Sequence, residues 1–294
     1  MLGSDWAGWL DRLPLLVSEV LEEWALAVDG TPTHGHCSLV VPVRAPGGRP
    51  AVLKVALPDD ESEHEHLALR HWQGDGAVRL LRADPHRRAM LLERLYAEDL
   101  GELDQVEACE VVAGLYGRLH VPALPQLRPL TEYVARWTAA LEALPRAAPV
   151  PRRLVEQAVS LAHDLLADPG STGTTIHADL HFGNVLAADR APWLAIDPKP
   201  VSGDPHYEIA PLLWNRWQEA VASDAVRDIL RRRFHAVVDV SGLDEDRARD
   251  WVVVRVLHNA TWAIDDARGQ HRGLTDADRD WITRMVTIAK AVQD

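Results

Sequence analysis

The segment from His177 to Asn184 reads His-Ala-Asp-Leu-His-Phe-Gly-Asn, and it is the most informative stretch of this chain. It places Asp179 five positions before Asn184, and Asp197 follows thirteen positions later within Ile-Asp-Pro. Carboxylate and amide oxygens are the hard ligands that Mg²⁺ prefers, usually together with phosphates and waters. The spacing therefore predicts a site at which one carboxylate lies beside an attacking hydroxyl and two oxygen ligands hold metal ions.

This segment also matches the catalytic-loop signature of kinases, H-R-D-L-x-x-x-N followed later by D-F-G. The match covers four positions of the loop, His177, Asp179, Leu180 and Asn184. Asp197 corresponds to the later aspartate, but Pro198 and Lys199 replace the Phe-Gly that usually follows it. The pattern thus indicates a phosphoryl-transfer site in which the motif around the second aspartate is altered.

Each polar residue of the segment receives an expected role. We expect Asp179 to act as the base or orienter of the hydroxyl, and Asn184 and Asp197 to bind magnesium. His177 is expected to brace the loop. His181, two positions after Asp179, lies where many kinases carry a lysine, so it is a candidate for contact with the transferring phosphate.

Two alternatives compete for the same residues. His177, Asp179 and His181 alternate, so on a strand their side chains would share one face and could form the zinc site of a hydrolase. That interpretation leaves Asn184 and Asp197 unexplained. The other alternative is a loop whose polar side chains are satisfied and carry no chemistry.

A lysine in an apolar strand supports the phosphoryl-transfer interpretation. Lys54 stands within Val-Leu-Lys-Val-Ala, similar in character to the V-A-I-K strand of kinases, and a lysine in such a strand needs a partner. We expect it to hold the α and β phosphates; the alternative is an edge-strand lysine that reaches into solvent. Glu65 is the preferred partner, because Glu61 leaves too little room for a strand end, a turn and a helical turn.

The first third of the chain is expected to form a small sheet with one helix after Pro58. Strands are predicted at residues 38–43, 51–57, 77–81 and 89–95, with a turn at 45–48. Backbone amides around Ser38 could contact phosphate, although the glycines of residues 30–38 do not fit G-x-G-x-x-G. By analogy with kinases, backbone groups near Glu93 and Leu95 would bind adenine.

The remainder of the chain is mainly helical in pattern. Helical spacing occurs at residues 104–120, 130–144 and 151–167 and again from Tyr207 onward, and the leading segment is also helical, divided at Pro14. We therefore predict an α+β fold of two lobes. Residues 1–95 form an antiparallel-sheet lobe that binds nucleotide, and residues 96–294 form a helical lobe with the catalytic loop and the substrate site.

Composition narrows the classes of function. The chain has 294 residues, 47% of them hydrophobic, and no apolar run long enough for a membrane span. Its net charge of −13 argues against nucleic acid as a partner and permits a cationic substrate, although ordinary solubility also explains it. The N-terminus lacks the pattern of a secretory signal, and two cysteines, Cys37 and Cys109, give no disulfide framework, so we expect a cytoplasmic protein.

Taken together, the chain resembles the aminoglycoside phosphotransferase family of the kinase-like fold, and within it the branch of streptomycin 6-kinases and hydroxyurea phosphotransferases. The resemblance is carried by residues 38–43, 76–81, 91–95, 177–186, 193–198, 203–205 and 259–262. It implies a bilobal fold, ATP with Mg²⁺ as the donor, and transfer to a hydroxyl of a small antibiotic-like molecule. Ala178, Phe182-Gly183 and Lys199 depart from commoner family versions, and Lys199 adds a positive charge that disfavours a guanidino substrate.

Candidate substrate residues lie near the C-terminus. Asn259, Trp262 and Asp266 are spaced by three and four, so they share one helical face, and Asp265 is adjacent. A carboxylate and an indole on one face could hold a cationic amino or guanidino sugar through a charged hydrogen bond and a cation–π contact. The alternative places Trp262 in the core and Asp265 in solvent.

The function predicted from sequence is an ATP-dependent O-phosphotransferase for an aminoglycoside of the streptomycin type, conferring antibiotic resistance. Within the same class, the acceptor could instead be hydroxyurea or a sugar. A kinase-like binding module without turnover is a third possibility, which the presence of Lys54, Asp179, Asn184 and Asp197 disfavours. Zinc hydrolysis is the least favoured.

Overall fold

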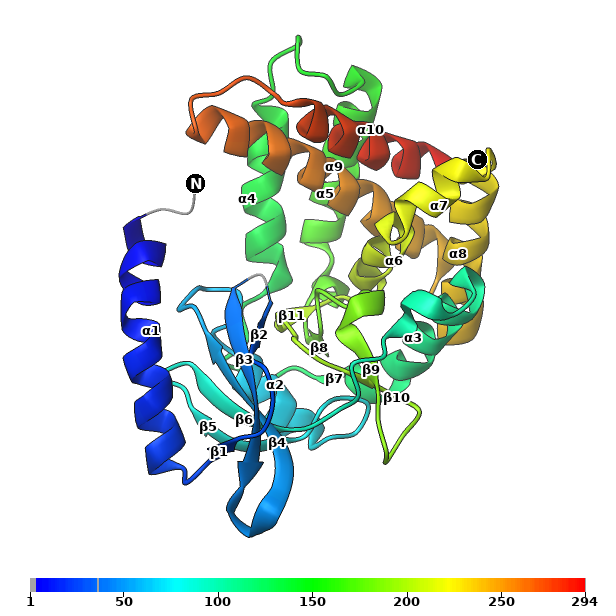
Figure 1. Cartoon of the computed structure of the whole chain (residues 1–294). Helices are drawn as coiled ribbons and strands as arrows, with labels where there is room; N and C mark the ends of the chain where they lie inside the picture. The colour runs from blue at the N-terminus through cyan, green and yellow to red at the C-terminus, as the bar shows by residue number, and fades with distance from the viewer. Residues whose placement is uncertain (1–3, 36, 294) are drawn as a thin grey trace. The chain divides into compact units, whose positions relative to one another are not determined.

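The computed structural model describes residues 4–35 and 37–293 (Figure 1). The chain divides into two compact units. Unit 1 consists of Met1–Glu98 with Leu186–Pro200, and unit 2 consists of Asp99–Val185 with Val201–Asp294. The expected lobe boundary between residues 95 and 96 stays a prediction; the chain enters unit 2 after Glu98 and returns once to unit 1.

Unit 1 is built on an antiparallel sheet of six strands in the order β1-β3-β4-β6-β5, with β2 paired to β3. The strands are β1 (Ala27–Val28), β2 (Thr33–His34), β3 (Ser38–Ala45), β4 (Arg49–Ala56), β5 (Leu80–Asp84) and β6 (Ala89–Glu93). Helix α1 (Ser4–Glu23) precedes the sheet and α2 (Glu65–Trp72) follows β4. Two short paired strands are β9 (Val185–Ala187), at whose first residue the chain leaves unit 2, and β10 (Trp193–Ala195) within the returning segment.

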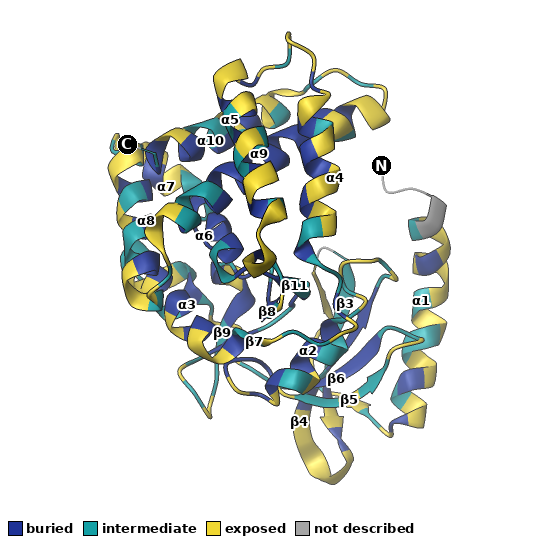
Figure 2. Ribbon diagram, turned by 180° about the vertical axis from the view of Figure 1, so that it is seen from behind, coloured by how far each residue is buried: buried dark blue, intermediate teal, exposed yellow. Residues whose placement is uncertain are grey.

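The core of unit 1 lies between α1 and one face of this sheet. Val20 and Trp24 pack with Val41, Leu53 and Leu91, all of them buried. Figure 2 shows buried positions along α1 and the strands of the sheet. The alternation of apolar side chains in β3 and β4 supplies the strand face, as period-two patterning requires. The sheet is thus anchored on this face, which fixes the register that places Lys54 opposite Val40 and Met90.

Helix α1 runs without a break through Pro14, so the expected division there is wrong. A proline inside a helix loses its hydrogen bond to the carbonyl four residues earlier. That carbonyl belongs to Leu10, which is half exposed, so water can satisfy it. The amphipathic packing of the rest of the helix against the sheet then outweighs the local penalty.

Unit 2 is mainly helical. Its helices are α3 (Gln105–Leu119), α4 (Leu130–Glu142), α5 (Arg152–Ala167), α6 (Ala210–Trp214), α7 (Trp217–Ala222), α8 (Val226–Ser241), α9 (Glu245–Gly269) and α10 (Asp276–Ala291). A small antiparallel sheet joins β7 (Val121–Pro122), β8 (Thr174–Ile176) and β11 (Val201–Gly203). Helix α9 is buried along most of its length and packs with α4 and α5 around Trp251 and Val254.

The predicted fold class, α+β with a small antiparallel sheet and a helical part, is confirmed. The strand expected at residues 77–81 begins only at Leu80, because Ala77 forms an isolated bridge with Ala195 instead. The helices predicted at 104–120, 130–144 and 151–167 are α3, α4 and α5, each within two residues of the expected ends. Among the described helices, none is long and apolar enough to cross a membrane.

Candidate active site

Three of the predicted site residues meet in unit 1. The ammonium of Lys54, on β4, lies 2.7 and 2.8 Å from the two carboxylate oxygens of Glu65, the first residue of α2. The same nitrogen donates to Oδ1 of Asp197, which follows β10. Lys54 and Glu65 are almost fully buried, whereas the side chain of Asp197 is 41% exposed. The predicted pairing of Lys54 with Glu65 is therefore observed, and Asp197 joins it.

Burial and charge oppose each other in this cluster. Burial alone would lower the pKa of Lys54, but Glu65 and Asp197 outweigh it and raise the pKa above its usual value, so the ammonium stays charged. Burial raises the pKa of Glu65 to about 7, against the attraction of Lys54. A buried lysine held between two carboxylates, one of them open to solvent, is a cation positioned to meet an anionic ligand.

The backbone of Asp197 adopts φ +56°, a left-handed conformation that non-glycine residues adopt at a cost. Two residues on, the ammonium of Lys199 lies 3.8 Å from Oε2 of Glu61. The positive charge that disfavoured a guanidino substrate is therefore partly balanced by an exposed carboxylate, and its effect at this site is smaller than the sequence alone suggested.

The predicted catalytic loop leaves β8 at Ile176 and belongs to unit 2. Ala178 adopts φ +63°, and both of its backbone groups are held. Its N–H donates to Oε1 of Glu208 at 2.6 Å, and its carbonyl accepts from Nη2 of Arg255 at 2.6 Å. The Arg255 guanidinium also donates to the carbonyl of Tyr207 at 2.7 Å and lies 4.1 Å from the centre of that ring. The strained turn before Asp179 is thus fixed by two buried charges.

The rest of the loop is held by its own side chains. Asp179 donates its N–H to Nδ1 of the fully buried His177 at 3.3 Å, so His177 braces the loop as expected. Nδ2 of Asn184 donates to the carbonyl of Asp179 at 2.8 Å. Because the donor end of that amide is used inside the loop, its oxygen is the atom with metal-ligand chemistry. The N–H of Phe182 is held by Oδ1 of Asn215 at 2.8 Å.

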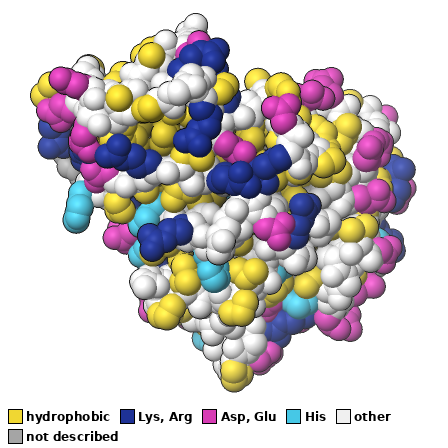
Figure 3. Space-filling view, turned by 90° about the horizontal axis from the view of Figure 1, so that it is seen from below, with side chains coloured by type: hydrophobic (Ala, Val, Ile, Leu, Met, Phe, Trp, Pro, Cys, Tyr) yellow, Lys and Arg dark blue, Asp and Glu magenta, His cyan; other side chains and the backbone are white. Residues whose placement is uncertain are grey.

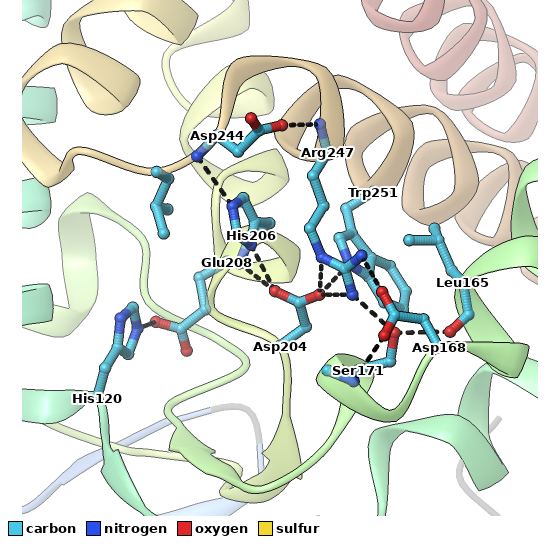
Figure 4. Close-up of polar contacts among 12 residues, drawn as sticks. His120, Leu165, Asp168, Ser171, Asp204, His206, Glu208, Asp244, Arg247 and Trp251 are labelled. Atoms are coloured by element: carbon cyan, nitrogen blue, oxygen red, sulfur yellow. Dashed lines mark hydrogen bonds and ion pairs between the residues drawn. The ribbon is translucent and has the colours of Figure 1, made fainter.

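A network of polar contacts in unit 2 joins the segment around Asp204 to α9 and to Asp168 (Figure 4). Asp204 is 1% exposed and accepts from Nε1 of Trp251, from Nε of Arg247 and from Nδ1 of His206, each at 2.6 Å. Arg247 also donates to Asp168 at 2.6 Å. Since Nε2 of His206 accepts from a backbone N–H at 3.0 Å, this network assigns the ring proton to Nδ1. Asp204 is therefore structural.

Glu208 is the buried acid of this scaffold. Its second oxygen lies 3.0 Å from Nε2 of His120. Burial would raise the pKa of Glu208, but the hydrogen bond from His120, aided by the Ala178 N–H, holds the pKa below its usual value. Glu208 is therefore a permanent carboxylate beneath the loop.

The residues predicted near adenine lie at the end of the unit 1 sheet. Glu93 closes β6, and its carboxylate is bound by the guanidinium of Arg190 at 2.5 to 3.0 Å and by the N–H of Arg79 at 2.7 Å. Arg190 also donates to the carbonyls of Gly74 and Ala77. Leu95 is half-buried just beyond the strand. The side chain of Glu93 is thus structural, and only backbone groups of this segment remain as adenine partners.

Ser38 begins β3 and pairs with Ala56 at the end of β4. The loop before it turns back on itself, because the N–H of Gly35 donates to the carbonyl of Ser38 at 2.9 Å. A Cβ at Gly35 would lie 3.1 Å from the Ser38 hydroxyl, so glycine keeps this approach close. The geometry is that of a tight loop at the edge of the sheet.

The predicted substrate residues share the outer part of α9. Trp262 is 52% exposed, so the alternative that placed it in the core is wrong. Asp265 is exposed and Asn259 is half-buried. Asp266 is bound by Arg272 at 3.0 Å and by Gln270 at 2.9 Å. Its charge is already paired, which makes Asp265 and Trp262 the better candidates for a cationic ligand.

Metal chemistry separates two of the predictions. Within residues 4–35 and 37–293, no three His, Cys, Asp or Glu side chains gather as metal ligands, so the zinc alternative finds no support there. The magnesium ligands predicted, Asn184 and Asp197, offer an amide oxygen and a carboxylate, which fit Mg²⁺ by donor chemistry. They belong to different units, so their joint action stays a prediction.

Sequence reasoning missed several residues that hold the catalytic loop in unit 2, and Arg190, which holds the segment around Glu93 in unit 1. Arg255 stands in the apolar run Val252–Leu257, and a buried arginine in such a run needs partners, which is the signal that could have identified it. Asn215 and His120 carried no such signal, because single polar residues at helix ends are common. Arg190 lies between two short strands, and no sequence pattern around it indicated its role.

Comparison with known proteins finds a matching family model and relatives that align with most of this chain. A family model described as aminoglycoside/hydroxyurea antibiotic resistance kinase matches residues 23–267. Streptomycin 6-kinase of Streptomyces glaucescens is 44% identical over 272 residues, which cover 90% of this chain and 87% of that protein. Hydroxyurea phosphotransferase of Kitasatospora aureofaciens is 42% identical over 265 residues, 88% of this chain and 75% of that protein.

Solved structures show the same fold at lower identity. A spectinomycin phosphotransferase in complex with ADP and spectinomycin has a TM-score of 0.60 at 13% identity and covers 95% of this chain and 98% of that one. The resemblance stated from the sequence motifs is confirmed by the family model and by the relatives above 40% identity. The chain belongs to the aminoglycoside/hydroxyurea antibiotic resistance kinase family.

Proposed function

We propose that this protein transfers the γ-phosphoryl group of ATP to a hydroxyl of a streptomycin-type aminoglycoside and thereby confers resistance to it. The observation that carries the proposal is the buried Lys54–Glu65 pair with Asp197 at the same ammonium. Such a cluster is what holds triphosphate in kinases. The acceptor follows from the 44% identity to a streptomycin 6-kinase over most of both chains. A reaction that consumes ATP would take place in the cytoplasm.

On the donor side, Lys54 would contact the α and β phosphates while Glu65 holds its ammonium in place. The loop before Ser38 would cover the phosphates with backbone amides. Backbone groups near Glu93 and Leu95 would bind the adenine, leaving the Glu93 side chain in its bonds with Arg190. Mg²⁺, when bound, would neutralise charge on the phosphates, with Asn184 and Asp197 as its protein ligands.

On the acceptor side, Asp179 would accept a hydrogen bond from the attacking hydroxyl and orient its oxygen toward phosphorus. The fixed turn at Ala178 keeps that carboxylate in position, because Glu208 and Arg255 hold both backbone groups. His181 would contact the transferring phosphate. The incoming phosphoryl group breaks its bond to ADP as the bond to the acceptor oxygen forms, and the hydroxyl proton passes toward Asp179.

The substrate would be a cationic amino or guanidino sugar. Asp265 and the exposed indole of Trp262 offer a carboxylate and a π face on α9, with Asn259 and the Arg272-paired Asp266 beside them. The net charge of −13 would attract such a cation over a distance of about a Debye length.

A second acceptor is favoured by a specific observation. The 42% identity to a hydroxyurea phosphotransferase is nearly as high as that to the streptomycin kinase. Hydroxyurea carries no cationic group, so it would not need the acidic and aromatic side chains of α9. The two acceptors therefore differ in their demand on Trp262 and Asp265.

The test of the proposal measures ADP release with MgATP and a panel of streptomycin, other aminoglycosides, hydroxyurea and a sugar. We expect the highest kcat/KM for streptomycin, and a loss in the Asp265→Asn variant that hydroxyurea does not share. MgATP at 100 times its Kd should also stabilise the fold by about 2.7 kcal/mol. Absence of both ADP release and this stabilisation would overturn the proposal.

Asp179→Asn tests the assignment of the acceptor carboxylate. We expect turnover to fall by about 10²–10⁴-fold, because general-base and orienting groups contribute on that scale, with nucleotide affinity nearly unchanged. Asp164→Asn, an exposed acid on α5, is the matched control and should retain full turnover. Turnover that survives the loss of the Asp179 carboxylate would show that another group orients the hydroxyl.

A further inference from the structure

A cavity of about 530 Å³ lies between α2 and β5 in unit 1, away from the Lys54 cluster. Its size falls in the range of small-molecule sites. Side chains of α2 form one wall and those of β5 and the segment before it form the other; they include His66, Leu69, Arg70, Arg79, Arg82 and Ala83. None of the functions assigned above uses this cavity.

The polar part of the cavity is cationic. Three arginines line it, and no Asp or Glu does. Arg82 is already engaged, since it bonds to Glu23 at 3.1 Å and lies 4.6 Å from the ring centre of Trp24. Among residues 4–35 and 37–293, the guanidinium groups of Arg70 and Arg79 make no hydrogen bond, although the charge of Arg79 helps to lower the pKa of Glu93. Both arginines are exposed, and two guanidinium groups with free donors around one cavity attract an anion.

The cationic lining of the cavity contrasts with the negative net charge of the whole chain. The chain as a whole carries −13, yet Figure 3 shows Lys and Arg side chains beside hydrophobic ones on one face of the molecule. Burial holds the pKa of His66 below its usual value, so near neutral pH the ring is uncharged and the arginines supply the positive charge. Cationic groups retained on an acidic protein are suited to an anionic ligand.

The remainder of the lining is apolar. Leu69 of α2 is fully buried and Leu81 of β5 packs into the core beneath α1, so the half-buried Leu80 and Ala83 of β5 supply the apolar surface that is open to a ligand. A free inorganic ion would leave this surface wet. A molecule with a compact apolar body and one anionic head would satisfy both parts of the lining.

Helix α2 connects this cavity with the phosphate-binding cluster. His66 and Arg70 are four positions apart, so they share one side of the helix, and Gln73 caps its C-terminal end; all three line the cavity. Glu65, Ala68, Leu69 and Trp72 form the buried side. A ligand held between α2 and β5 would therefore fix the short helix whose first residue holds Lys54.

We propose that this cavity binds an organic anion, an aryl or alkyl phosphate or carboxylate, and that its occupation fixes the position of α2. Arg70 and Arg79 bind the anionic head, and Leu80 and Ala83 of β5 cover the apolar body. The binding stands apart from the proposed function; only its effect on the nucleotide site rests on that function.

Calorimetric titration of the full chain with phenyl phosphate tests the binding, with inorganic phosphate and phenol as the two halves of the probe. We expect phenyl phosphate to bind more tightly than either half, and the Arg70→Gln/Arg79→Gln variant to bind it at least tenfold more weakly. Arg146→Gln/Arg153→Gln removes the same charge from exposed sites in unit 2 and should leave the affinity unchanged. Ala83→Phe keeps the arginines and fills the cavity, so it should also abolish binding.

Circular dichroism and melting temperature establish that each variant is folded. The proposal is overturned if the wild type does not bind phenyl phosphate at millimolar concentration, or if both cavity variants bind it as the wild type does. The effect on α2 is measured as a change in ADP affinity when phenyl phosphate saturates, present in the wild type and absent in Arg70→Gln/Arg79→Gln. Equal ADP affinity with and without phenyl phosphate would overturn the coupling alone, and loss of ADP binding altogether would count against the proposed function.

Discussion

Glu65 in unit 1 and Glu208 in unit 2 are buried to the same degree, 1% and 0% exposed, yet their pKa values move in opposite directions. Burial raises that of Glu65 to about 7, since its partner Lys54 is shared with Asp197. Glu208 overcomes the same burial through His120 and a backbone N–H. A carboxylate bonded to dedicated donors is a fixed part of a scaffold, whereas one that depends on a shared cation responds to what that cation binds.

This comparison assigns the two units different tasks. The unit 1 cluster contains one ammonium between two carboxylates, and an anionic ligand would change its balance of charge. The unit 2 scaffold holds the turn at Ala178 from both sides and leaves no such freedom. We infer that unit 1 adapts to the nucleotide and that unit 2 presents a rigid acceptor site.

Glu208→Gln should cause the largest loss of stability, because it removes the carboxylate that holds the unit 2 scaffold. The amide can accept from only one of the two donors and buries an N–H beside the other, so we expect the free energy of unfolding to fall by about 3 kcal/mol. In a protein of this size that lowers Tm by roughly 6–12 °C. Differential scanning calorimetry measures it, with Glu156→Gln, an exposed partner of Arg152, as the control that should change by less than about 1 kcal/mol. Equal effects in the two variants would contradict the scaffold role.

Glu65→Gln should show the opposite behaviour, visible as a pH dependence. The folded pKa of Glu65 lies above its unfolded value, so the folded state binds more protons between about pH 4.5 and 7. The unfolding free energy of the wild type, relative to the variant, should therefore fall as pH rises through this window, by at most about 3 kcal/mol. Urea unfolding at several pH values without nucleotide measures it. A difference that is constant or rises with pH would show that Glu65 is ionised like Glu208.

Arg255→Lys tests whether unit 2 needs the planar shape of the guanidinium or only its positive charge. Lysine keeps the charge but cannot donate to the carbonyls of Ala178 and Tyr207 with one planar group. We expect a loss of about 2 kcal/mol in stability and a roughly tenfold or larger loss of turnover, while ADP affinity in unit 1 is retained. Steady-state kinetics and ADP titration separate the two. A weaker ADP affinity with unchanged turnover would reverse the proposed division of tasks.

The difference between the two units also explains which site residues could be predicted from the sequence. Lys54, Asp179, Asn184 and Asp197 were identified because chemistry fixes both their type and their spacing, and the Lys54–Glu65 pair followed from the length of a strand end and a turn. The fold class followed from the change of hydrophobic period after residue 100. These features are local in the chain or repeat regularly, so a pattern can show them.

The scaffold residues lacked such patterns. Arg255 lies 77 positions from Ala178, and Arg190 lies 97 from Glu93, so nothing in the chain connects them before it folds. Trp262 shows the opposite limit: helical spacing alone could not decide between core and surface, and only packing placed it in solvent. The tertiary contacts of single polar residues could therefore not be predicted from the sequence.

Arg190→Gln gives the smallest expected effect and tests whether unit 1 has any scaffold of its own. Arg190 joins the Glu93 carboxylate to two backbone carbonyls and so fixes the segment expected to contact adenine. Its loss should raise the KM for ATP about five- to tenfold, roughly 1 kcal/mol, because backbone positioning is loosened while the Lys54 cluster stays intact. The value of kcat should remain within about twofold, and Arg152→Gln, at an exposed pair, is the control. A fall in kcat with an unchanged KM would place Arg190 in the acceptor machinery instead, and the contrast between an adaptable unit 1 and a fixed unit 2 would then have to be redrawn.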